Sequence, residues 1–282
     1  MWKKIVIIIA CVLLAAGIGL ILFPIISNEI GKTRANDAIE AFVKRSENAV
    51  EEYLPPYIKE AAENGDEEAK QAKPAKSRSE AIELGYIDKN GFPLSAKGNR
   101  LGGAPIVFKY DLEMLHTDSI EYNHGLINNQ GTVDTSDYTT AALDMSKYGL
   151  SNFYCYLTAP EIGMRLPVYL GANEDVMSYG AAHLCNTSLP LDEKSTNCAI
   201  AAHTGYIGRI FFDNIKGLGK GDVITVNNYW ESIDYEVIET KTISPNDTSD
   251  IYIKEGRQLL TLITCTTDNG VTNRYVVIAE KK

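Results

Sequence analysis

The longest uncharged stretch of the chain runs from Ile5 to Ile26 and consists mainly of Ile, Val, Leu, Ala and Gly. A run of this length crosses the hydrocarbon core of a bilayer as one helix. Lys3 and Lys4 precede it, which by the positive-inside tendency predicts a cytoplasmic N-terminus and places everything after Ser27 outside. A cleaved signal peptide is the alternative, although the run is longer than a usual signal core and lacks a clear A-x-A site.

We therefore predict that residues 1–28 form a cytoplasmic stub and a transmembrane anchor. No second apolar span follows in the sequence, and the chain ends in Glu280-Lys281-Lys282. The expected location is the cell membrane, in a single-pass topology with the folded part of the protein on the extracellular side.

Residues 29–76 are expected to form a helical stalk or helices packed against the outer domain. From Thr33 to Leu54 the apolar residues recur at spacings of three and four, which predicts an amphipathic helix ended by the proline pair at Pro55. Residues 60–76 contain Ala, Glu, Asp and Lys with almost no large apolar side chain. That composition indicates an exposed helix or tether.

Residues 77–140 show no long periodic segment, and glycines punctuate them. We predict an irregular region that is either a lid over a neighbouring site or a linker. His116 and His124 lie here without companions at metal-ligand spacing, and the acidic loops lack the spacing of a calcium site. We predict no metal centre.

After Leu150 the chain changes to short β-rich segments separated by turns, the pattern of an all-β barrel or sandwich. We assign residues 141–282 to this domain and expect a short helical piece over 211–215. The expected strands are Phe153–Leu157, Leu166–Tyr169, Ala199–Ala202, Val223–Asn227, Ile233–Thr242, Leu259–Thr264 and Arg274–Ala279.

The composition narrows the class of function. A chain of 282 residues allows one large domain or a domain with an appendage, and 45% hydrophobic residues suffice for a packed core. The formal net charge of -10 at pH 7 argues against a nucleic acid as partner, because phosphate binding needs a basic face.

Three reactive side chains are predicted to lie at strand ends. The β-rich run 259–264 predicts a strand with Cys265 at its end, and Arg274 is the first residue of the next predicted strand. We therefore expect the thiol and the guanidinium to lie at the same edge of the sheet. His203 follows the apolar run 199–202 and ends a third strand. A reactive thiol needs a neighbouring cation, the leaving group of an acyl transfer needs a proton donor, and a guanidinium can meet charge on the attacked carbonyl oxygen. The set predicts acyl transfer by a nucleophilic cysteine.

These residues resemble a known family, the sortases, which are membrane-bound cysteine transpeptidases of Gram-positive bacteria. Thr261-Leu262-Ile263-Thr264-Cys265 matches their TLxTC signature, with Arg274 downstream and His203 in the expected upstream block. The resemblance runs from about Tyr156 to the C-terminus. Segments that look like class C, pilin-polymerising sortases begin at Pro160, Leu166, Gly180, Thr187 and Pro245.

The resemblance implies a mainly β fold, a closed sortase-type barrel of about eight strands with short helices. It makes His203, Cys265 and Arg274 the catalytic residues, and Thr264 is expected to contact substrate. The implied reaction cleaves an LPxTG-like sorting signal through a thioester acyl-enzyme and joins it to an amine, here a pilin lysine. No cofactor is required by that scheme.

Two alternatives stay open. Housekeeping sortases use the same residues to attach surface proteins to a cross-bridge amine of peptidoglycan, and this chain contains no Asp-Pro pair of the kind that marks the class C lid. A non-catalytic surface protein that only binds a peptide strand is the alternative from another class. The expected partners are sorting-signal proteins, an amine acceptor and the membrane.

Four other cysteines accompany Cys265. Cys11 lies in the apolar run, and core packing is the simplest role for Cys155. Cys185 and Cys198 flank a polar loop in an oxidising compartment, so a disulfide and two free thiols are both open. His183 precedes that loop, and we predict a structural role for it.

Overall fold

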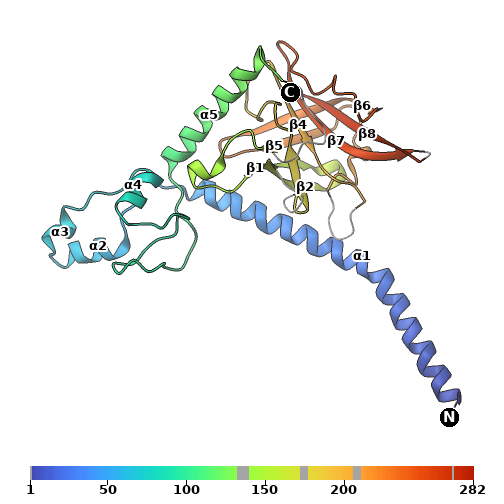
Figure 1. Ribbon diagram of the computed structural model, residues 1–282, viewed down its shortest axis with the longest axis horizontal. Coiled ribbons are helices and arrows are strands. Elements are labelled where there is room, and N and C mark those ends of the chain that lie inside the picture. The colour runs from blue at the N-terminus through green and yellow to red at the C-terminus, as the bar shows by residue number, and fades with distance from the viewer. Residues whose placement is uncertain (1, 132–139, 172–176, 206–210, 269) are drawn as a thin grey trace.

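A computed structural model describes every residue except 1, 132–139, 172–176, 206–210 and 269. Among the described residues, eight strands close into a barrel in the order β1-β2-β3-β4-β7-β8-β6-β5 (Figure 1). This confirms the predicted closed β-barrel. The strands are β1 Phe153–Ala159, β2 Met164–Leu170, β3 Ala181–His183, β4 Thr196–Ala201, β5 Val223–Asn227, β6 Ser232–Ile243, β7 Gln258–Asp268 and β8 Val271–Lys281.

Two apolar clusters divide the faces of the barrel wall. One cluster fills the barrel and includes Leu260, Leu262 and Val277. The other covers the opposite face of β4, β7 and β8 and includes Ile263 and Val276. Both faces of these three strands are therefore buried over most of their length, which explains their nearly continuous apolar sequences.

All the predicted strands are present. Val223–Asn227 has its predicted ends, and each of the other strands has one or both ends shifted. β7 and β8 are longer than predicted because every residue of their hairpin finds a cross-strand partner as far as Asp268 and Val271. β3 was missed, since Ala181–His183 is too short to carry a strand pattern and pairing with β2 and β4 defines it. The helical piece expected over 211–215 was wrong except at Ile215, because the Phe212 N–H donates to the distant His203 carbonyl at 3.0 Å and residues 211–214 form a turn. The 3-10 helices among the described residues are η1 Met145–Tyr148, η2 Pro160–Ile162 and η3 Ile215–Gly217.

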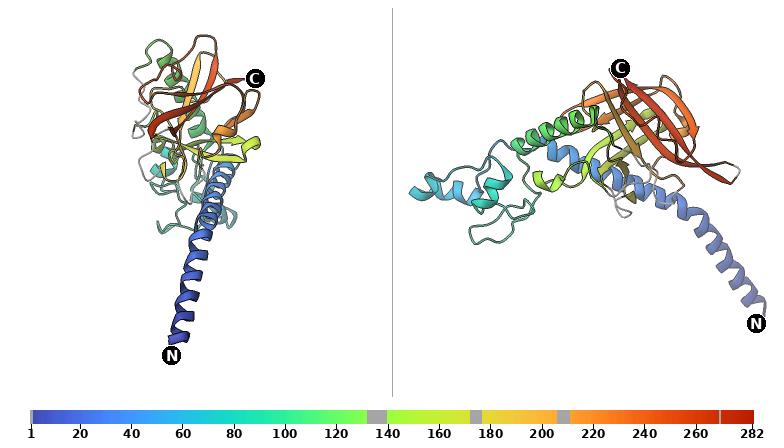
Figure 2. Two further views of the ribbon diagram at one scale, coloured as in Figure 1. Left: turned by 90° about the vertical axis from the view of Figure 1, so that its right-hand side faces the viewer. Right: turned by 45° about the horizontal axis from the view of Figure 1, so that its top comes forward.

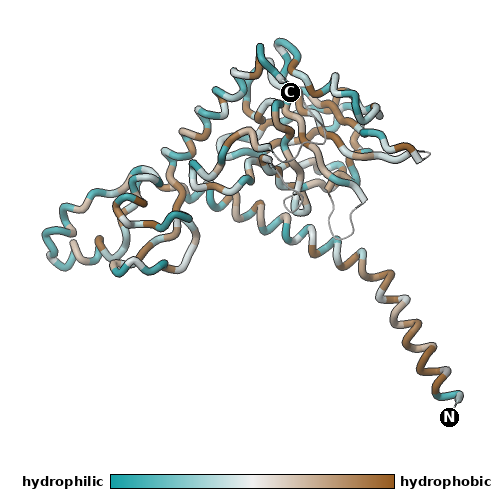
Figure 3. Tube along the Cα trace, in the orientation of Figure 1, coloured by the Kyte–Doolittle hydropathy of each residue, from teal (hydrophilic) through white to brown (hydrophobic). Residues whose placement is uncertain are grey.

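α1 spans Trp2–Glu47 as one helix. Its apolar N-terminal part projects away from the barrel (Figures 1 and 3). Among the described residues it is the one helix long and apolar enough to cross a membrane, a test that a signal sequence near the N-terminus also passes. The predicted extension to Leu54 was wrong, because the Val50 N–H donates to the Val107 carbonyl at 2.8 Å and pairs this segment with distant backbone.

The C-terminal half of α1 packs on the barrel. Ile39 and Phe42 are buried, and the Phe42 ring stacks on Phe153 at a centroid distance of 4.5 Å and lies 4.3 Å from Tyr229. Of the two forms expected for residues 29–76, this part takes the packed one.

Residues 50–108 form a small lobe between α1 and α5. The lobe contains α2 Pro56–Glu63, α3 Glu67–Lys70 and α4 Arg78–Glu83. α2 and α3 bury none of their residues, in keeping with the exposed segment predicted there. The lobe lies at the opposite end of the molecule from the tip of the β7–β8 hairpin (Figures 1 and 2). Its own apolar core consists of Ala75, Ala81, Tyr86, Ile87 and Phe108.

A 19-residue helix, α5 Lys109–Ile127, corrects the prediction that residues 77–140 are irregular throughout. The periodicity was hidden because the buried face of α5 carries Asp111, Ser119 and Asn123 among its leucines. Asn123 fits there because it exchanges two hydrogen bonds with the Leu189 backbone, at 2.7 and 3.0 Å.

The lid remains a prediction. Residues 132–139, which belong to the segment expected to cover the site, lie outside the described residues. Just before them, Gln130 accepts a hydrogen bond from the Ile253 N–H at 2.9 Å and donates to the Asn186 carbonyl at 2.9 Å. The end of this region is thus joined to the loop between β6 and β7.

Candidate active site

Cys265 and Arg274 lie directly opposite each other in the β7–β8 ladder. Arg274 Nη1 donates a hydrogen bond to Cys265 Sγ over 3.3 Å, and both residues are half-buried. Two residues earlier along the same face, Ile263 pairs with Val276 in the apolar cluster outside the barrel. Because residues two apart share one face of a sheet, the thiol and the guanidinium continue that face beyond the cluster.

His203 reaches the same level from β4. β4 and β7 run parallel, and their last registered pair is Ala201 with Ile263. The ladder continues for one more hydrogen bond, from the Ala202 N–H to the Ile263 carbonyl at 3.2 Å. Two residues beyond the last pair, the register sets His203 level with Cys265. The fold therefore brings the three predicted catalytic residues to one end of three adjacent strands.

Thr264 joins β7 to the segment that carries His203. Its hydroxyl donates to the Ala202 carbonyl at 2.8 Å, and the residue is 3% exposed. Neighbouring residues in a strand face opposite sides, so this hydroxyl points away from the face of Cys265. The buried, bonded hydroxyl favours a positioning role for Thr264, and the predicted substrate contact stays a prediction.

Asp213 closes the loop that follows His203. Its carboxylate accepts hydrogen bonds from the Gly205 N–H at 2.6 Å, the Phe211 N–H at 3.0 Å and the Thr204 hydroxyl at 3.5 Å. The His203 carbonyl accepts from the Phe212 N–H at 3.0 Å. The sequence did not predict a role for Asp213, because a lone acid in an aromatic segment matches no motif. Its role depends on the folded chain bringing the Gly205 N–H to its carboxylate.

The imidazole of His203 sits in a partly buried setting. Burial lowers the pKa of His203 below its ordinary value of 6.5. The centroid of the Phe211 ring lies 6.4 Å from that of the imidazole. The neutral form, which can accept a proton from a thiol, is therefore favoured at neutral pH.

A second cation lies on the other face of the hairpin. Lys216 Nζ donates to Thr266 Oγ1 at 2.6 Å and lies 5.7 Å from the centroid of the Tyr275 ring. Thr266 follows Cys265 directly, so its side chain faces the opposite side of β7. Arg274 is thus the cation on the face of the sulfur.

A family model described as the Sortase domain matches residues 157–282. Sortase D of Bacillus subtilis is 25% identical over 128 residues, and Sortase A of Listeria monocytogenes is 30% identical over 127 residues. The pilus-related Sortase C of Group B Streptococcus, a solved structure, is 30% identical with a TM-score of 0.54, covering 62% of this chain and 91% of that one. This chain belongs to the sortase family.

A second solved sortase C, from Streptococcus pneumoniae, is 25% identical with a TM-score of 0.55, covering 62% of this chain and 89% of that one. The class C resemblance predicted from the motifs is confirmed at the level of fold. Each curated sortase aligns with 44% of this chain, and the chain spans 62% and 54% of the lengths of the Bacillus and Listeria proteins. The family match contains the barrel from Leu157 onward, whereas α1, the lobe and α5 precede it.

The other three histidines of this sortase each contact neighbouring groups of the fold. His183 is 1% exposed, and its Nε2–H donates to the Ser188 carbonyl at 3.0 Å. Burial lowers the pKa of His183 to about 4. His116 lies 4.6 Å from the Trp230 ring, and His124 Nε2 lies 3.2 Å from a Glu193 oxygen. In the part of the chain that the structure describes, His, Cys, Asp and Glu side chains form no group suited to a metal ion.

None of the other cysteines, Cys185 and Cys198 included, takes part in a disulfide within the part of the chain that the structure describes. The disulfide left open for that pair is not formed, because Cys198 belongs to the cluster that fills the barrel while Cys185 lies in the loop after β3. Burial raises the pKa of the Cys155 and Cys198 thiols, which leaves them unreactive.

Proposed function

We propose that this sortase is a cysteine transpeptidase in which Cys265 is the nucleophile, His203 carries the proton and Arg274 stabilises charge. The observation that carries the proposal is the 3.3 Å contact between Arg274 Nη1 and Cys265 Sγ, on the strand next to the one that leads to His203. Acyl transfer requires a nucleophile, an acid–base group and a fixed donor for the oxyanion. These three side chains supply them.

In the acylation step, the neutral imidazole of His203 accepts the thiol proton and the Cys265 thiolate attacks the carbonyl carbon of the scissile peptide bond. A C–S bond forms, and Arg274 stabilises the negative charge on the carbonyl oxygen. The C–N bond then breaks as His203 returns the proton to the leaving amine. The products are a thioester on Cys265 and a released C-terminal fragment.

In the second step, an acceptor amine attacks the thioester. His203 takes a proton from that amine, a new C–N bond forms and the C–S bond breaks. The sulfur leaves as thiolate and recovers the proton from His203. One amide bond replaces another, so the cycle involves no net oxidation or reduction.

We infer that the acyl donor is an LPxTG-like sorting signal and that the amine is a pilin lysine. Two neighbours support this assignment: the Group B Streptococcus structure is of a pilus-related sortase, and the pneumococcal one concerns pilin substrate specificity. Attachment to a peptidoglycan amine is the second candidate, favoured by the likeness to Sortase A of Listeria.

We further infer that α1 anchors the enzyme as a single pass. Its most apolar 18-residue window has a mean hydropathy of 3.2 and is 0% buried. Lys3 and Lys4 before this run favour a cytoplasmic N-terminus, which places the barrel on the outer side.

The test mixes the full chain in neutral detergent with an LPxTG-type peptide and reads the products by intact mass spectrometry. We expect a thioester adduct on Cys265 that Cys265→Ala abolishes and Cys185→Ser preserves. Transfer of the adduct to a pilin-lysine peptide supports pilus assembly, and transfer only to a cross-bridge peptide supports wall attachment. Absence of any adduct on the folded wild-type enzyme would overturn the proposed reaction for this signal.

A further inference from the structure

A cavity of about 110 Å³ lies between α1 and the barrel, and Cys265 is not among its lining residues. This volume is well above the roughly 10–15 Å³ that a single water molecule requires. Its apolar side is formed by buried Met164, Leu166 and Phe211, and Ser178 and Tyr179 also line it. The catalytic scheme uses none of these five residues.

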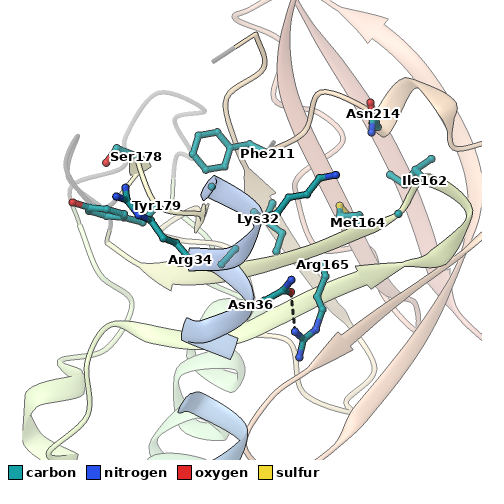
Figure 4. A pocket seen from close by; sticks show the side chains of 14 residues that line it. Lys32, Arg34, Asn36, Ile162, Met164, Arg165, Ser178, Tyr179, Phe211 and Asn214 are labelled. Atoms are coloured by element: carbon teal, nitrogen blue, oxygen red, sulfur yellow. Dashed lines mark hydrogen bonds between the residues drawn. The ribbon is translucent and has the colours of Figure 1, made fainter. Parts of the chain in front are cut away.

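The charged side chains among the described lining residues are all cations. Lys32 and Arg34 come from α1 and Arg165 comes from β2, as Figure 4 shows. Arg165 Nη1 donates to Asn36 Oδ1 at 2.8 Å, which fixes one guanidinium against the helix. The only ion pair that Lys32 makes with a described residue is at 3.8 Å, to exposed Glu29.

Arg34 is the most available of the three. It forms no hydrogen bond or ion pair with the residues that the structure describes, and it is exposed. A guanidinium presents a planar fork of donors that matches the oxygens of a phosphate. In Figure 4 the three cationic groups point in different directions around the cavity, so the exposed Lys32 and Arg34 side chains would turn toward an anion that they share.

The position along α1 indicates where that anion resides. The apolar run ends at Ile26, and at 1.5 Å per residue Lys32 lies about 9 Å and Arg34 about 12 Å farther along the helix. The headgroup region of a bilayer is about 5–8 Å thick on each side. Long basic side chains reach back toward such a surface, and basic residues next to a span attract anionic lipids.

We propose that this cavity binds the phosphate of an anionic lipid headgroup and so holds the barrel against the membrane surface. The inference rests on the anchoring by α1 proposed above. It does not depend on the identity of the sorting signal or of the amine.

The test uses the full chain in neutral detergent, titrated separately with short-chain phosphatidylglycerol, short-chain phosphatidylcholine and inorganic phosphate, with binding read by native mass spectrometry. The site variant is Lys32→Gln/Arg34→Gln/Arg165→Gln. The matched control, Lys59→Gln/Lys97→Gln/Lys220→Gln, removes the same charge from three exposed lysines elsewhere. Arg34→Gln alone serves as the variant least able to disturb folding.

Each basic residue close to an anionic membrane surface strengthens binding about fivefold. The site variant, which lacks three of them, should therefore bind phosphatidylglycerol about 100-fold more weakly, and Arg34→Gln about fivefold more weakly. The control should stay within about twofold of wild type. Equal weakening in the site and control variants, or equal binding of phosphatidylcholine, would overturn the site. If inorganic phosphate binds as tightly as the lipid, the proposal that a lipid headgroup supplies the bound phosphate is overturned.

Peptide cleavage measured on the same samples separates the two proposals. Cleavage with unchanged kinetics in the site variant, together with lost lipid binding, supports both. If the wild type cleaves the peptide but binds no lipid, the lipid site is contradicted and the proposed reaction is still supported. Lipid binding without cleavage leaves the lipid site supported and contradicts the proposed reaction.

Discussion

Arg274 and Cys265 face each other across the β7–β8 ladder, with Nη1 of the arginine 3.3 Å from Sγ of the cysteine. We expect Arg274→Ala to lower kcat/KM for a sorting peptide by about 100- to 1000-fold, because a fixed oxyanion donor is lost. Arg274→Lys should recover only part of this, since an ammonium lacks the fork of the guanidinium. Arg257→Ala is the control: Arg257 pairs with Glu280 at 2.7 Å beside the other end of the hairpin. Wild-type kcat/KM in Arg274→Ala would contradict the assigned role.

The Thr264 hydroxyl bridges to the Ala202 carbonyl at 2.8 Å. Thr264→Val breaks this bond and loosens His203 relative to Cys265, so we expect kcat to fall about 10- to 100-fold with KM unchanged. Thr264→Ser keeps the hydroxyl and should retain most of the activity. A rise in KM with constant kcat in the valine variant would instead favour the substrate contact predicted from the signature.

Asp213 holds the loop after His203 by accepting the Gly205 N–H at 2.6 Å and the Phe211 N–H at 3.0 Å. Asp213→Asn removes the charge and sets an amide donor against those N–H groups, so kcat should fall about tenfold. The imidazole titration of His203, followed by NMR, should shift as well. Asp222→Asn is the control, since Asp222 accepts the Gly219 N–H at 2.8 Å farther along the chain. Equal losses in the two variants would contradict a specific role for Asp213.

His183 makes stability depend on pH. Its folded pKa of about 4 lies below the ordinary value of 6.5, so between these values the unfolded chain binds a proton that the folded chain does not. The free energy of unfolding therefore falls as pH drops from 6.5 to 4, by about 3 kcal/mol from this group. His183→Gln keeps a donor for Ser188 but has no imidazole to protonate. The free energy of unfolding of the wild type should therefore fall, relative to that of the variant, by this amount between pH 6.5 and pH 4.

The pH test compares chemical unfolding of the wild type, His183→Gln and His124→Gln at pH 7 and pH 4. His124 is the control because its side chain is 62% exposed. Its variant should track the wild type within about 1 kcal/mol at both values. If the free energies of unfolding of His183→Gln and the wild type differ by the same amount at pH 7 and pH 4, the prediction is contradicted.

Gly149 and Gly163 end two 3-10 helices in the left-handed region, with φ of 70° and 62°. An added Cβ at Gly163 meets nothing within 4 Å, so Gly163→Ala should cost only the backbone term of about 1–2 kcal/mol. At Gly149 the Cβ would lie 2.3 Å from Arg78 Cδ, and we expect a larger loss. In the Arg78→Ala background the two alanine variants should cost the same. An excess at Gly149 that persists there would rule out the arginine as its cause.

Local patterns predicted a large part of this protein. The uncharged run before Ser27, the alternating apolar segments after Leu150 and the signature ending at Cys265 are each contained in a few adjacent residues. α5 escaped prediction because Asp111, Ser119 and Asn123 interrupt its apolar face, and β3 did so because three residues carry no period.

Residue type and spacing by themselves determined the apolar helix and the all-β class. The sortase-like signature added the closed barrel and the expected catalytic set of His203, Cys265 and Arg274. Only the tertiary structure decided that Thr264 is buried, that Asp213 closes the histidine loop and that Lys32 and Arg165 share a cavity. The physical reason is the distance along the chain between the residues that interact. Strand register and the partners of a polar side chain depend on segments far apart in the chain, and their contact energies exist only once those segments meet.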